Sequence, residues 1–466
     1  MEKVGKRGHV LLLPYPSQGH INPSLQFAKR LVSKGLKATL VTTIFIAKSI
    51  RPELGPIGVE TISDGYDDGG FAKADSIQSY LKRLETVGSV TLAELIKKLN
   101  RFGADPINCI IYDAFLPWAL TVARQFGLVG AAFFTQSCAV NNIYYQFGKG
   151  LLKVDPTSTT TRTSGVLISG LPAPFQLSDL PSFLGVPGSY PAYLELVLNQ
   201  LINVEEADWI FVNTFDKLEL QVVDWMTKIF PVLRTIGPTI PSAYLDKQIE
   251  DDTDYGLNLY EPDSSICMNW LSSRATDTVV YVSFGSMAEL NKEQMEELAM
   301  GLMGSNFYFL WVVRASEENK LSSKILEDIK SANQGLVVRW SPQLKVLSHE
   351  AVGCFITHCG WNSTIEALSL GVPMVGIPQW TDQTTNAKFV EDEWGVGVRA
   401  KVDDDEKGIT TRKEIEVCIR KVMEGEQGKE IKRNANKWRK QAQEAVDVGG
   451  SSFQNIDEFI AKLICS

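Results

Sequence analysis

The sequence has few histidines, no excess of basic residues and no long hydrophobic run near its start, and each shortage argues against a class of protein. It holds four His, and its 46 Lys and Arg stand against 55 Asp and Glu, which gives a net charge of −9. That balance disfavours a nucleic-acid or anionic-membrane partner. The apolar stretch from Val10 to Leu13 ends at Pro14, so it is too short for a signal peptide or a membrane span. We therefore expect a cytoplasmic protein with no membrane or nucleic-acid partner.

Two common glycine-rich phosphate motifs are also missing. Neither the G-x-G-x-x-G pattern of NAD sites nor a Walker-type loop occurs, which argues against an NAD oxidoreductase. The seven cysteines are odd in number and scattered, as is typical of reduced thiols. His358 with Cys354 and Cys359 does not complete a metal ligand set, so we expect no metal and no cofactor.

The chain begins with a pattern typical of a doubly wound parallel sheet. His9 to Leu13 is a predicted strand, and a loop leads to Asn22, which we expect to cap a helix with Pro23 in its first turn. Gly35 ends that helix, and Lys37 to Thr43 is the next strand. This βαβ unit places the protein in the α/β class.

The length of 466 residues is comfortable for two domains of ordinary size. Prolines, acidic residues and a lack of periodicity mark a linker at 241–264. We therefore predict an N-terminal domain at 1–240, a C-terminal domain at 265–450 and a last amphipathic helix at 451–466. Further predicted strands are Asn108–Tyr112 followed by Asp113, Val129–Phe134 followed by Thr135, Asp208–Phe215, Val232–Ile236, Thr278–Phe284 and Phe307–Val313. Further predicted helices are Ser76–Asn100 with a bend or break at Gly88, Pro117–Phe126, a helix from Asn291 to about Met303, Thr384–Trp394, Thr410–Glu424 and Glu430–Val446, while Asp155–Gly165 is a predicted exposed loop.

The most informative stretch runs from Trp340 to Gln383, here called the 340–383 box. Its pattern predicts a short helix followed by two parallel strands, each of which ends in a turn. The predicted elements are helix Pro342–Ser348, strand Val352–Thr357, helix Asn362–Leu370 ended by Gly371, and strand Pro373–Ile377. Polar residues after two parallel strands meet at the carboxyl edge of the sheet, where such folds bind ligands.

The polar residues of the box suit a sugar nucleotide. Gly360, Asn362 and Ser363 lie where a helix begins, and free N–H groups at a helix start favour an anion such as a diphosphate. One turn later, Glu366 can accept hydrogen bonds from a ribose diol. The remaining contributors are Trp340, which can stack on a base, and Asp382 and Gln383, which can bind sugar hydroxyls.

At these residues the sequence resembles a known family. W-x-P-Q, HCGWNS-x-x-E and W-x-D-Q at this spacing resemble the nucleotide-sugar box of plant secondary-metabolite UDP-glycosyltransferases, which are inverting family 1 enzymes. The resemblance extends from PYPSQGHINP to the C-terminal helix, and PSAYLDKQ and THCGWNSTIEAL look closest to glucosyltransferases of salicylate, thiohydroximates, triterpenoids and steroids. It implies a GT-B fold, with two Rossmann-like doubly wound domains facing each other across a cleft, and the helix 451–466 packed on the first domain. It also implies a monomer that uses a UDP-sugar donor and a small lipophilic acceptor, with no metal.

His20 and Asp113 are the candidate catalytic residues. Each follows a predicted parallel strand, so both can reach one sheet edge, and a histidine backed by a carboxylate is a suitable general base. Taken alone, a histidine in a loop or an aspartate after a strand is more often structural. The resemblance gives His20 the role of base toward the acceptor hydroxyl and Asp113 that of its partner, with inversion to a β-glucoside.

The resemblance also assigns the donor contacts. His358 and Ser286 would bind the diphosphate, Thr135 the sugar 6-hydroxyl, and Gln383 resembles the last box residue of glucose-using members. Apart from their spacing around HCGWNS, Trp340 would be interpreted as a core residue and Glu366 as a solvent-exposed residue on a helix face. The full predicted donor set is Ser286, Trp340, Gln343, His358, Gly360, Trp361, Asn362, Ser363, Glu366, Trp380, Asp382, Gln383 and Thr135.

The acceptor is the least determined part. Predicted loops Asp64–Phe71, Ser137–Phe147 and Pro181–Tyr193 carry aromatic residues that suit a flat apolar molecule, although each may equally be core. The candidates are Tyr66, Phe71, Tyr144, Tyr145, Phe183, Tyr190 and Tyr193. With no clear cation near these loops, we expect a steroid, triterpenoid, flavonoid or other phenolic hydroxyl. Glucose-ester formation on a carboxylate, a sugar-nucleotide-binding protein without activity, and a GT-B epimerase or hydrolase stay open as alternatives.

Overall fold

The computed structural model describes residues 8–49, 55–102, 105–154, 165–186, 188–256, 262–402 and 408–465. The predicted loop Asp155–Gly165 lies almost wholly outside these residues. The chain forms two compact units, each made of more than one segment. Unit 1 comprises Met1–Pro174, Val186–Leu259 and Glu444–Ser466, and unit 2 comprises Phe175–Gly185 and Tyr260–Gln443.

Most of the predicted linker 241–264 belongs to unit 1, where Asp246 pairs with Arg30 at 2.7 Å. The units differ from the predicted domain boundaries at two further places. Phe175–Gly185 groups with unit 2, where the buried carboxylate of Asp179 pairs with Arg399 at 2.6 Å. Glu444 begins a segment of unit 1, and Val446 is buried there with Ile240 and Leu245. In both cases side-chain packing between distant parts of the chain, and not sequence position, decides which unit a segment joins.

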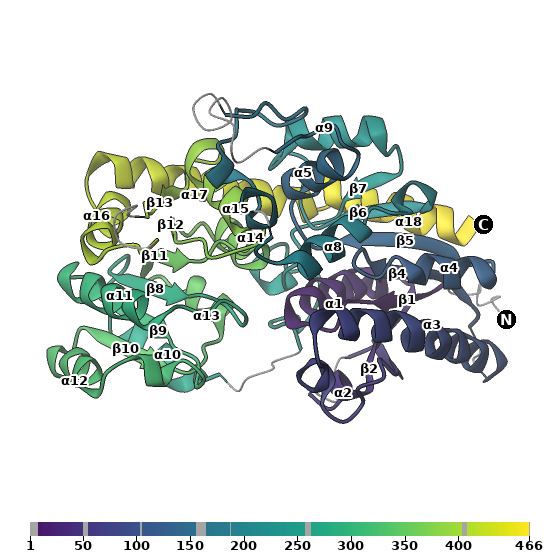
Figure 1. The fold of residues 1–466 in the computed structure, drawn as a ribbon, viewed down its shortest axis with the longest axis horizontal. Coiled ribbons are helices and arrows are strands. Elements are labelled where there is room, and N and C mark those ends of the chain that lie inside the picture. Colours follow the sequence, from purple (N-terminus) through teal and green to yellow (C-terminus); the bar gives the residue numbers. More distant parts are fainter. Residues whose placement is uncertain are drawn as a thin grey trace. The chain divides into compact units, whose positions relative to one another are not determined.

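Unit 1 is built on one parallel sheet of seven strands in the order β3-β2-β1-β4-β5-β6-β7 (Figure 1). Every neighbouring pair is parallel. The strands are β1 His9–Leu13, β2 Lys37–Thr43, β3 Gly58–Ile62, β4 Ile107–Asp113, β5 Val129–Phe134, β6 Trp209–Val212 and β7 Leu233–Thr235. Strands β1, β4 and β5 are almost wholly buried, as expected for a parallel sheet covered by helices on both faces.

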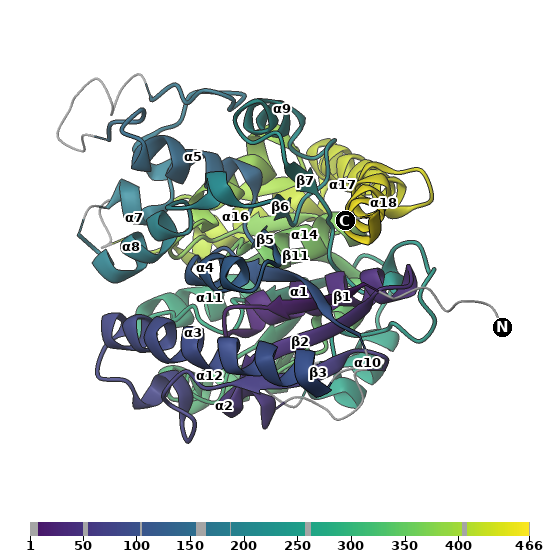
Figure 2. The ribbon, with the colours of Figure 1, turned by 90° about the vertical axis from the view of Figure 1, so that its right-hand side faces the viewer.

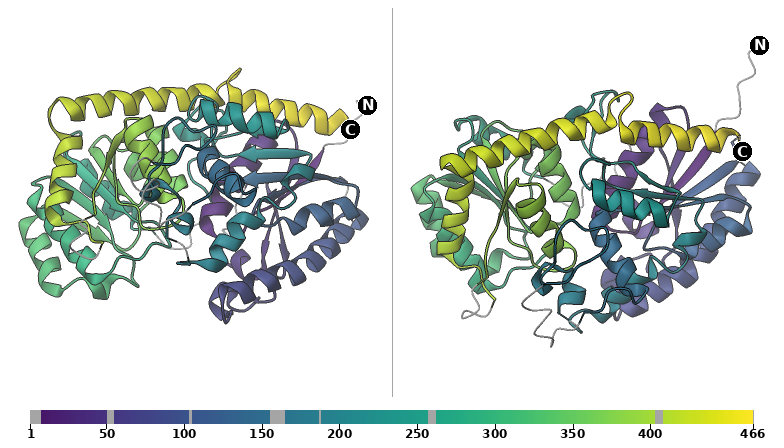
Figure 3. Two further views of the ribbon diagram at one scale, coloured as in Figure 1. Left: turned by 45° about the horizontal axis from the view of Figure 1, so that its top comes forward. Right: turned by 90° about the horizontal axis from the view of Figure 1, so that it is seen from above.

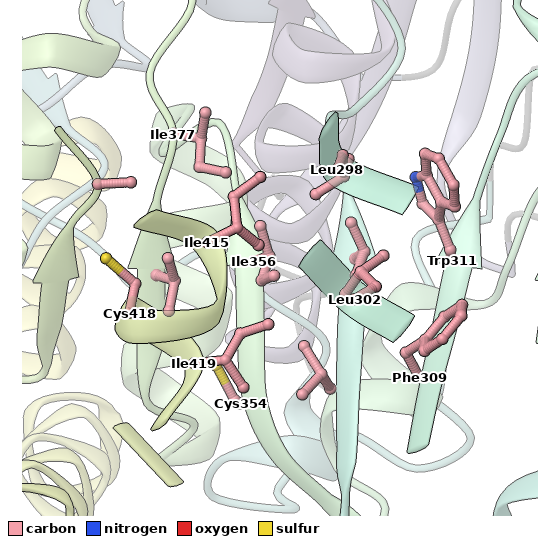
Figure 4. Packing of buried hydrophobic residues seen from close by; sticks show 14 of the residues in the cluster. Leu298, Leu302, Phe309, Trp311, Cys354, Ile356, Ile377, Ile415, Cys418 and Ile419 are labelled. Atoms are coloured by element: carbon pink, nitrogen blue, oxygen red, sulfur yellow. The ribbon is translucent and has the colours of Figure 1, made fainter. Parts of the chain in front are cut away.

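Unit 2 repeats this plan with six parallel strands in the order β10-β9-β8-β11-β12-β13. The strands are β8 Val279–Ser283, β9 Tyr308–Val312, β10 Gly335–Val338, β11 Val352–Thr357, β12 Met374–Gly376 and β13 Gly397–Arg399. Its core joins both helices and strands: Figure 4 shows Leu298 and Leu302 beside Phe309 and Trp311, with Ile415 nearby. Burying such side chains stabilises each by about 1.5–3 kcal/mol.

The helices of unit 1 connect its strands in the expected αβ alternation. They are α1 Gln18–Ser33, α2 Ile44–Ala47, α3 Ile77–Phe102, α4 Trp118–Gln125, α5 Cys138–Gly148, α8 Pro191–Asn199, α9 Leu220–Ile229 and α18 Ser451–Cys465. Those of unit 2 are α7 Ser182–Gly185, α10 Ser264–Ser272, α11 Lys292–Gly304, α12 Ser323–Ala332, α13 Gln343–Leu347, α14 Trp361–Leu370, α15 Gln383–Lys388, a π-helix at Phe389–Glu393, and α16 Arg412–Met423. Helix α17, Gly425–Val446, begins in unit 2, and its last residues, from Glu444, belong to unit 1. Among the described residues, none of the helices combines the length and apolar character that crossing a membrane requires.

The C-terminal helix α18 packs on the sheet of unit 1, as the resemblance implies. It follows α17 at the yellow end of the chain (Figure 3). Phe459 contacts Trp209 and Phe211 edge-on, with ring centroids 5.5 and 5.0 Å away. At the polar end of the same contact, Ser452 Oγ donates to the Gly237 carbonyl at 2.6 Å, and Arg234 pairs with Glu458.

The prediction for the start of α1 was wrong. We expected the helix to begin after Asn22, but it begins at Gln18 with Pro23 inside it. The N–H groups of His20 and Ile21 already donate to the Ser17 carbonyl, so the first turn closes before Pro23 is reached. His20 therefore lies in the first turn of a helix and not in a loop, which limits its backbone freedom.

Two other segments also differ from expectation. The predicted loop Ser137–Phe147 is α5, whose start is capped by Ser137 Oγ accepting from the Val140 N–H at 3.3 Å. We expected Gly88 to break or bend helix α3, but the helix continues through it. The missing side chain of Gly88 leaves room for the ring of Trp118, since a Cβ there would lie 3.1 Å from it. Figure 2 shows this long helix together with the parallel strands β1, β2 and β3. The short strands β3, β10 and β13 were not predicted at all.

Candidate functional site

Each sheet has one switch point, where the strand order reverses, and both switch points carry polar side chains. In unit 1 the switch lies between β1 and β4. Asp113 is the last residue of β4, and His20 lies in the first turn of α1, the helix that follows β1. In unit 2 it lies between β8 and β11, and Ser286 and His358 follow these strands. Open parallel sheets bind ligands at the carboxyl ends of the strands at such points.

His20, Asp113 and Thr135 form a hydrogen-bonded group in unit 1. His20 Nδ1 lies 2.7 Å from Asp113 Oδ2, and Thr135 Oγ1 lies 3.0 Å from the same nitrogen. The other carboxylate oxygen of Asp113 accepts from the Phe115 N–H at 3.0 Å. An Nδ1–H pointing at the carboxylate leaves Nε2 as the nitrogen with a lone pair, which a general base requires.

The two members of the pair differ in exposure. Only 1% of the Asp113 side chain is exposed, against 18% of the His20 side chain. The His20 side chain is therefore accessible to a ligand, whereas the Asp113 side chain is almost completely buried. Tyr15 and Phe115 pack around the imidazole, with ring centroids 5.3 and 4.9 Å from it. Sequence reasoning missed both, although each stands two residues beyond the end of its strand, β1 or β4.

The turn after β11 is shaped for close approach of the backbone. Cys359 has φ +60°, a left-handed conformation that is uncommon outside glycine, and Gly360 is the N-cap of α14. The imidazole of His358 lies against two glycines: a Cβ on Gly360 would be 2.5 Å from Nε2, and one on Gly285 would be 3.0 Å from Cε1. An alanine at either position would displace the ring. The first N–H groups of α14 are the kind of donors that suit an anion at this turn.

Burial lowers the pKa of His358 to about 4, with the charge of Arg314 acting in the same direction, while a backbone hydrogen bond with Ser283 opposes them. The His358 ring is therefore neutral at physiological pH. A diphosphate beside it would favour the protonated ring, because an opposite charge stabilises the charged form. Arg314 also fixes the turn after β8, since its guanidinium donates to the carbonyls of Ser286 and Ala288. No motif in the sequence indicates this role of Arg314.

Glu366, the predicted contact of the ribose, belongs to a buried hydrogen-bond network. Gln343 Nε2 donates to Glu366 Oε2 at 2.7 Å and lies 3.0 Å from Ser363 Oγ. Tyr281 OH donates to Gln343 Oε1 at 3.1 Å and lies 2.8 Å from Ser341 Oγ. Tyr281 was not predicted, because a tyrosine inside a buried strand reads as core. The network fixes the direction of the Glu366 carboxylate, which is itself 5% exposed.

Trp340 is partly buried at the start of the box, and its carbonyl accepts from the Asp263 N–H at 3.1 Å. That bond ties the box to the start of α10. Trp361 and Asn362 occupy the first two positions of α14, and Trp361 is buried with its ring centroid 6.1 Å from that of Trp394. Trp361 therefore serves packing in this unit, while Asn362, which is only partly buried, stands at the helix start.

Residues Trp380–Gln383, here called the 380–383 turn, follow β12. Gln383 Oε1 accepts from the N–H groups of Gln379 and Trp380 at 2.9 and 3.1 Å, so the amide group holds the turn together. Thr381 has φ +57°, another left-handed conformation for a residue with a side chain. Asp382 and Gln383 are both buried, at 5% and 3% exposure. A buried carboxylate and amide next to each other can discriminate between hydroxyl positions of a sugar.

Asn386 links Asp382 to the turn after β11, the one that contains Cys359 and Gly360. Asn386 Nδ2 lies 2.7 Å from Asp382 Oδ2 and 2.9 Å from the Cys359 carbonyl, to both of which it donates. Burial raises the pKa of Asp382 to about 6, while hydrogen bonds, chiefly that from Asn386, act in the opposite direction. Asp382 is thus ionised at neutral pH but close to its titration range. Asn386 was not predicted, since its place on the inner face of α15 has no motif.

The predicted acceptor residues fall into three groups. Tyr144 and Tyr145 are buried on α5, where Tyr145 packs edge-on against Phe230 at 5.1 Å. Phe183 is buried in unit 2 and meets Trp380 edge-on at 5.9 Å. The others have more solvent contact: Tyr66 and Phe71 pack around Tyr80, and Tyr193 lies 6.3 Å from Tyr190, ring to ring. Of these, Tyr193 is tied to the His20 region, because the pKa of Tyr15 is raised mainly by burial and secondly by Tyr193.

Cysteines and metal ligands add no further centre within the described part of the chain. All seven cysteines are free, and six of them are buried. The described residues contain no group of three or more His, Cys, Asp or Glu side chains arranged to hold a metal ion. Burial raises the pKa of Cys354 and Cys359, so both stay neutral thiols near His358.

Each of the two α/β units contributes part of the proposed site. Unit 1 carries the histidine–aspartate pair, and unit 2 carries a helix start, a buried carboxylate network and a polar turn. Together they suit an enzyme that transfers a sugar from a nucleotide. The chain belongs to the family described as "UDP-glucoronosyl and UDP-glucosyl transferase", whose model matches residues 196–440. It is therefore a glycosyltransferase by family.

The chain is similar to plant enzymes over almost its whole length. The chain is 56% identical over 462 residues to UDP-glycosyltransferase 74F2 of Arabidopsis thaliana, with 98% of this chain and 99% of the relative covered. It is 52% identical over 465 residues to the flavonol 7-O-beta-glucosyltransferase of the same plant, with 99% of each covered. Among solved structures, Os79 of O. sativa in complex with UDP matches at a TM-score of 0.91 and 42% identity, covering 97% of this chain and 100% of that one. The GT-B fold of the plant enzymes is thus confirmed for this chain.

Proposed function

We propose that the protein transfers glucose from UDP-glucose to a hydroxyl group of a small lipophilic acceptor, with inversion to a β-glucoside. The observation that carries the proposal is the 2.7 Å hydrogen bond between His20 and the buried Asp113, in a chain whose other unit carries the whole nucleotide-sugar box. A protein that only binds a sugar nucleotide needs no such pair.

The donor would be held by unit 2. The start of α14 and the side chains of Asn362, Ser363 and His358 would receive the diphosphate, with Ser286 as a further contact. Glu366 would accept from the ribose diol, and Trp340 would stack on the uracil. Asp382 and Gln383 would bind glucose hydroxyls, with Trp380 beside them. Thr135, which the structure brings next to His20, would meet the sugar 6-hydroxyl in the reacting complex.

The chemical step requires one proton transfer and one displacement. Nε2 of His20 takes the proton of the acceptor hydroxyl, and that oxygen attacks the anomeric carbon from the face opposite UDP. The bond between this carbon and the diphosphate oxygen breaks, and UDP leaves with the electron pair. Asp113 stabilises the imidazolium that forms.

The charge that develops on the leaving diphosphate would be met by protein groups alone. The N–H groups of α14, the neutral donors around it and a protonated His358 together offer several hydrogen bonds. We therefore expect the reaction to proceed without a metal or a cofactor. Addition of EDTA to the assay should leave the rate unchanged, and a fall restored by Mg²⁺ would contradict this expectation.

The surroundings of His20 support an apolar, aromatic acceptor. Tyr15 and Phe115 pack on its imidazole, and Tyr193 lies near Tyr15. The printed name of the flavonol 7-O-beta-glucosyltransferase relative supports a phenolic hydroxyl. A carboxylate acceptor, which would give a glucose ester, is the second candidate. Because one chain supplies both sets of residues and its cysteines are free, we further propose that it acts as a monomer in the cytoplasm.

Affinity for UDP-glucose should fall as the pH is lowered through the pKa of Asp382, which is about 6. The raised pKa means that the carboxylate is present above pH 6 and is lost below it, and only the carboxylate accepts two sugar hydroxyls. If the ionised form alone binds the sugar well, Kd rises roughly tenfold from pH 7 to pH 5. Isothermal titration without acceptor measures this directly, since UDP-glucose itself does not titrate in the range.

The matched control for this titration is Asp382→Asn, which should bind more weakly but with no loss of affinity toward acid. Protonation of His358 would strengthen diphosphate binding at low pH in both proteins, so the difference between them isolates Asp382. Equal pH profiles for the two proteins would remove Asp382 from the sugar site.

The function itself is tested by measuring UDP release from UDP-glucose, with mass detection of products, against steroid, triterpenoid, flavonoid and phenolic-acid acceptors. A product heavier by one hexose, formed only with an acceptor, is the expected result. A base-labile product would identify an ester in place of a glucoside. Release of UDP without acceptor would favour a hydrolase, and UDP binding without any product would favour a binding protein.

A further inference from the structure

The 380–383 turn is not held by its own residues alone. Thr381 has φ +57°, in the left-handed region, which is strained for a residue with a side chain and persists only where its surroundings hold it. Inside the turn, Gln383 secures only the N–H groups of Gln379 and Trp380. The N–H and carbonyl of Thr381 itself need partners from elsewhere.

Those partners come from Phe175–Gly185, here called the 175–185 strap, which lies about 200 residues earlier in the chain but belongs to unit 2. Thr381 N donates to Ser182 Oγ at 2.7 Å, and Ser182 N donates to the Thr381 carbonyl at 2.9 Å. Ser182 thus satisfies both backbone groups of the strained residue.

The strap is itself firmly bound to the helix that follows the turn. Thr384 Oγ1 donates to the Leu180 carbonyl at 2.6 Å, and Thr385 Oγ1 donates to the Asp179 carbonyl at 2.7 Å. The Asp179 carboxylate pairs with Arg399 at 2.6 Å and lies 3.6 Å from Lys388 Nζ. With Asp179 only 1% exposed, this charge is compensated in a buried place and resists displacement.

Aromatic packing completes the attachment. Phe183 meets the ring of Trp380 edge-on at 5.9 Å, and Phe183 is 3% exposed. At the other end of the strap, Phe175 is fully buried, with its ring 6.3 Å from Phe389 and 5.3 Å from Lys388 Nζ. Both ends of the strap are therefore fixed, and Ser182 lies between them.

We propose that the 175–185 strap sets the conformation of the 380–383 turn, and that Ser182 is a positioning residue for recognition of the donor sugar. The inference rests on the proposed role of Asp382 and Gln383 as ligands of glucose. Because Thr381 immediately precedes them, a change in its backbone direction moves both side chains. The proposed contacts of UDP at Trp340, Glu366 and the start of α14 lie on other elements, so we expect a change in the strap to affect them less than it affects Asp382 and Gln383.

The test compares Ser182→Ala with wild type by isothermal titration of UDP and of UDP-glucose. Loss of one buried hydrogen bond should raise Kd for UDP-glucose about 5- to 20-fold and leave Kd for UDP within about 2-fold. The ratio of kcat/KM with UDP-glucose to that with UDP-galactose, its C4 epimer, should fall by a similar factor. Ser182→Thr keeps the hydroxyl and should restore both values.

Ser322→Ala is the matched control. Ser322 is an exposed serine of unit 2 whose hydroxyl accepts from the Ile325 N–H at the start of α12, so the substitution removes the same kind of bond away from the turn. It should leave both Kd values unchanged. Phe183→Leu gives a second probe, because it weakens the contact with Trp380 without creating an unpaired polar group, and it should shift the UDP-glucose affinity in the same direction as Ser182→Ala.

The results separate this inference from the proposed function. If wild type transfers glucose while Ser182→Ala and Phe183→Leu keep the wild-type affinity ratio and sugar preference, the strap has no positioning role and the function stands. Equal weakening of UDP and UDP-glucose would show a general structural effect and overturn the inference as well. If wild type binds UDP but gains nothing from the glucose moiety, the proposed donor is wrong and the inference fails with it.

Discussion

Replacing His20 with alanine is expected to lower kcat by about 10²–10⁴-fold while leaving the affinity for UDP unchanged. Among the described residues, the His20 imidazole is the hydrogen-bond partner of Asp113 whose other nitrogen can take the acceptor proton, while the Asp113 side chain is only 1% exposed. UDP would be held by residues of unit 2, so the substitution should not affect its binding. Single-turnover kinetics with a competent acceptor, together with titration of UDP, measure both quantities.

Three comparisons make the His20 prediction specific. Asp113→Asn should also lower kcat, because the amide no longer stabilises the imidazolium or fixes its tautomer. His349→Ala is the matched control: His349 lies near Ser272 and accepts from the Ala351 N–H, away from both proposed sets, so its loss should leave kcat within about 2-fold. Added imidazole should partly restore His20→Ala. Wild-type turnover in that variant would end its assignment as the base.

Replacing Glu366 with alanine should weaken UDP binding by about 10- to 100-fold, as expected for the loss of hydrogen bonds to a charged group. Gln343 and, through it, Tyr281 hold the carboxylate in one direction, so its oxygens are already ordered before the ribose arrives. Acceptor affinity should not change. The measurement is titration of UDP into each protein.

The analogue 2′,3′-dideoxy-UDP separates a ribose contact from a general structural effect. Wild type should bind it 10- to 100-fold more weakly than UDP, because it lacks both hydroxyls. Glu366→Ala should bind the two ligands equally. A variant that still prefers UDP by the wild-type factor would place the ribose contact on another residue, and Gln343 would be the next to test.

The sequence was most informative where chemistry and local structure coincide. Asn291 and Thr411 cap α11 and α16, with side chains accepting from the N–H three residues on, as their place before a periodic run indicates. In the 340–383 box, strand β11 has the predicted bounds, and α14 begins one residue before the predicted Asn362 and ends before Gly371 as expected. The anion site needs only this local order: a strand, a tight turn and a helix start.

The sequence was less informative where contacts with distant parts of the chain outweigh local sequence signals. Pro23 suggested a helix start, yet the first turn of α1 forms earlier and carries Pro23 inside the helix. The aromatic residues of the predicted loop Ser137–Phe147 belong to α5, whose first N–H groups donate to the buried carboxylate of Glu219, about 80 residues away. Ser137 is a local N-cap of this helix, but the bonds from Glu219 to its first N–H groups leave no signal in the sequence around the helix.

By itself, the sequence determined the α/β class, the order of the main strands and helices, and the residues of the nucleotide-sugar box, because each depends on neighbours within one or two turns. Only the tertiary structure decided that Asp113 and Thr135 both lie within hydrogen-bond distance of His20 Nδ1, that Tyr281 and Gln343 orient Glu366, and that Ser182 supports Thr381. These contacts join residues between 23 and 199 positions apart. Hydrogen bonds and packing across such separations follow from how sheets and helices come together, and no spacing along the chain encodes them.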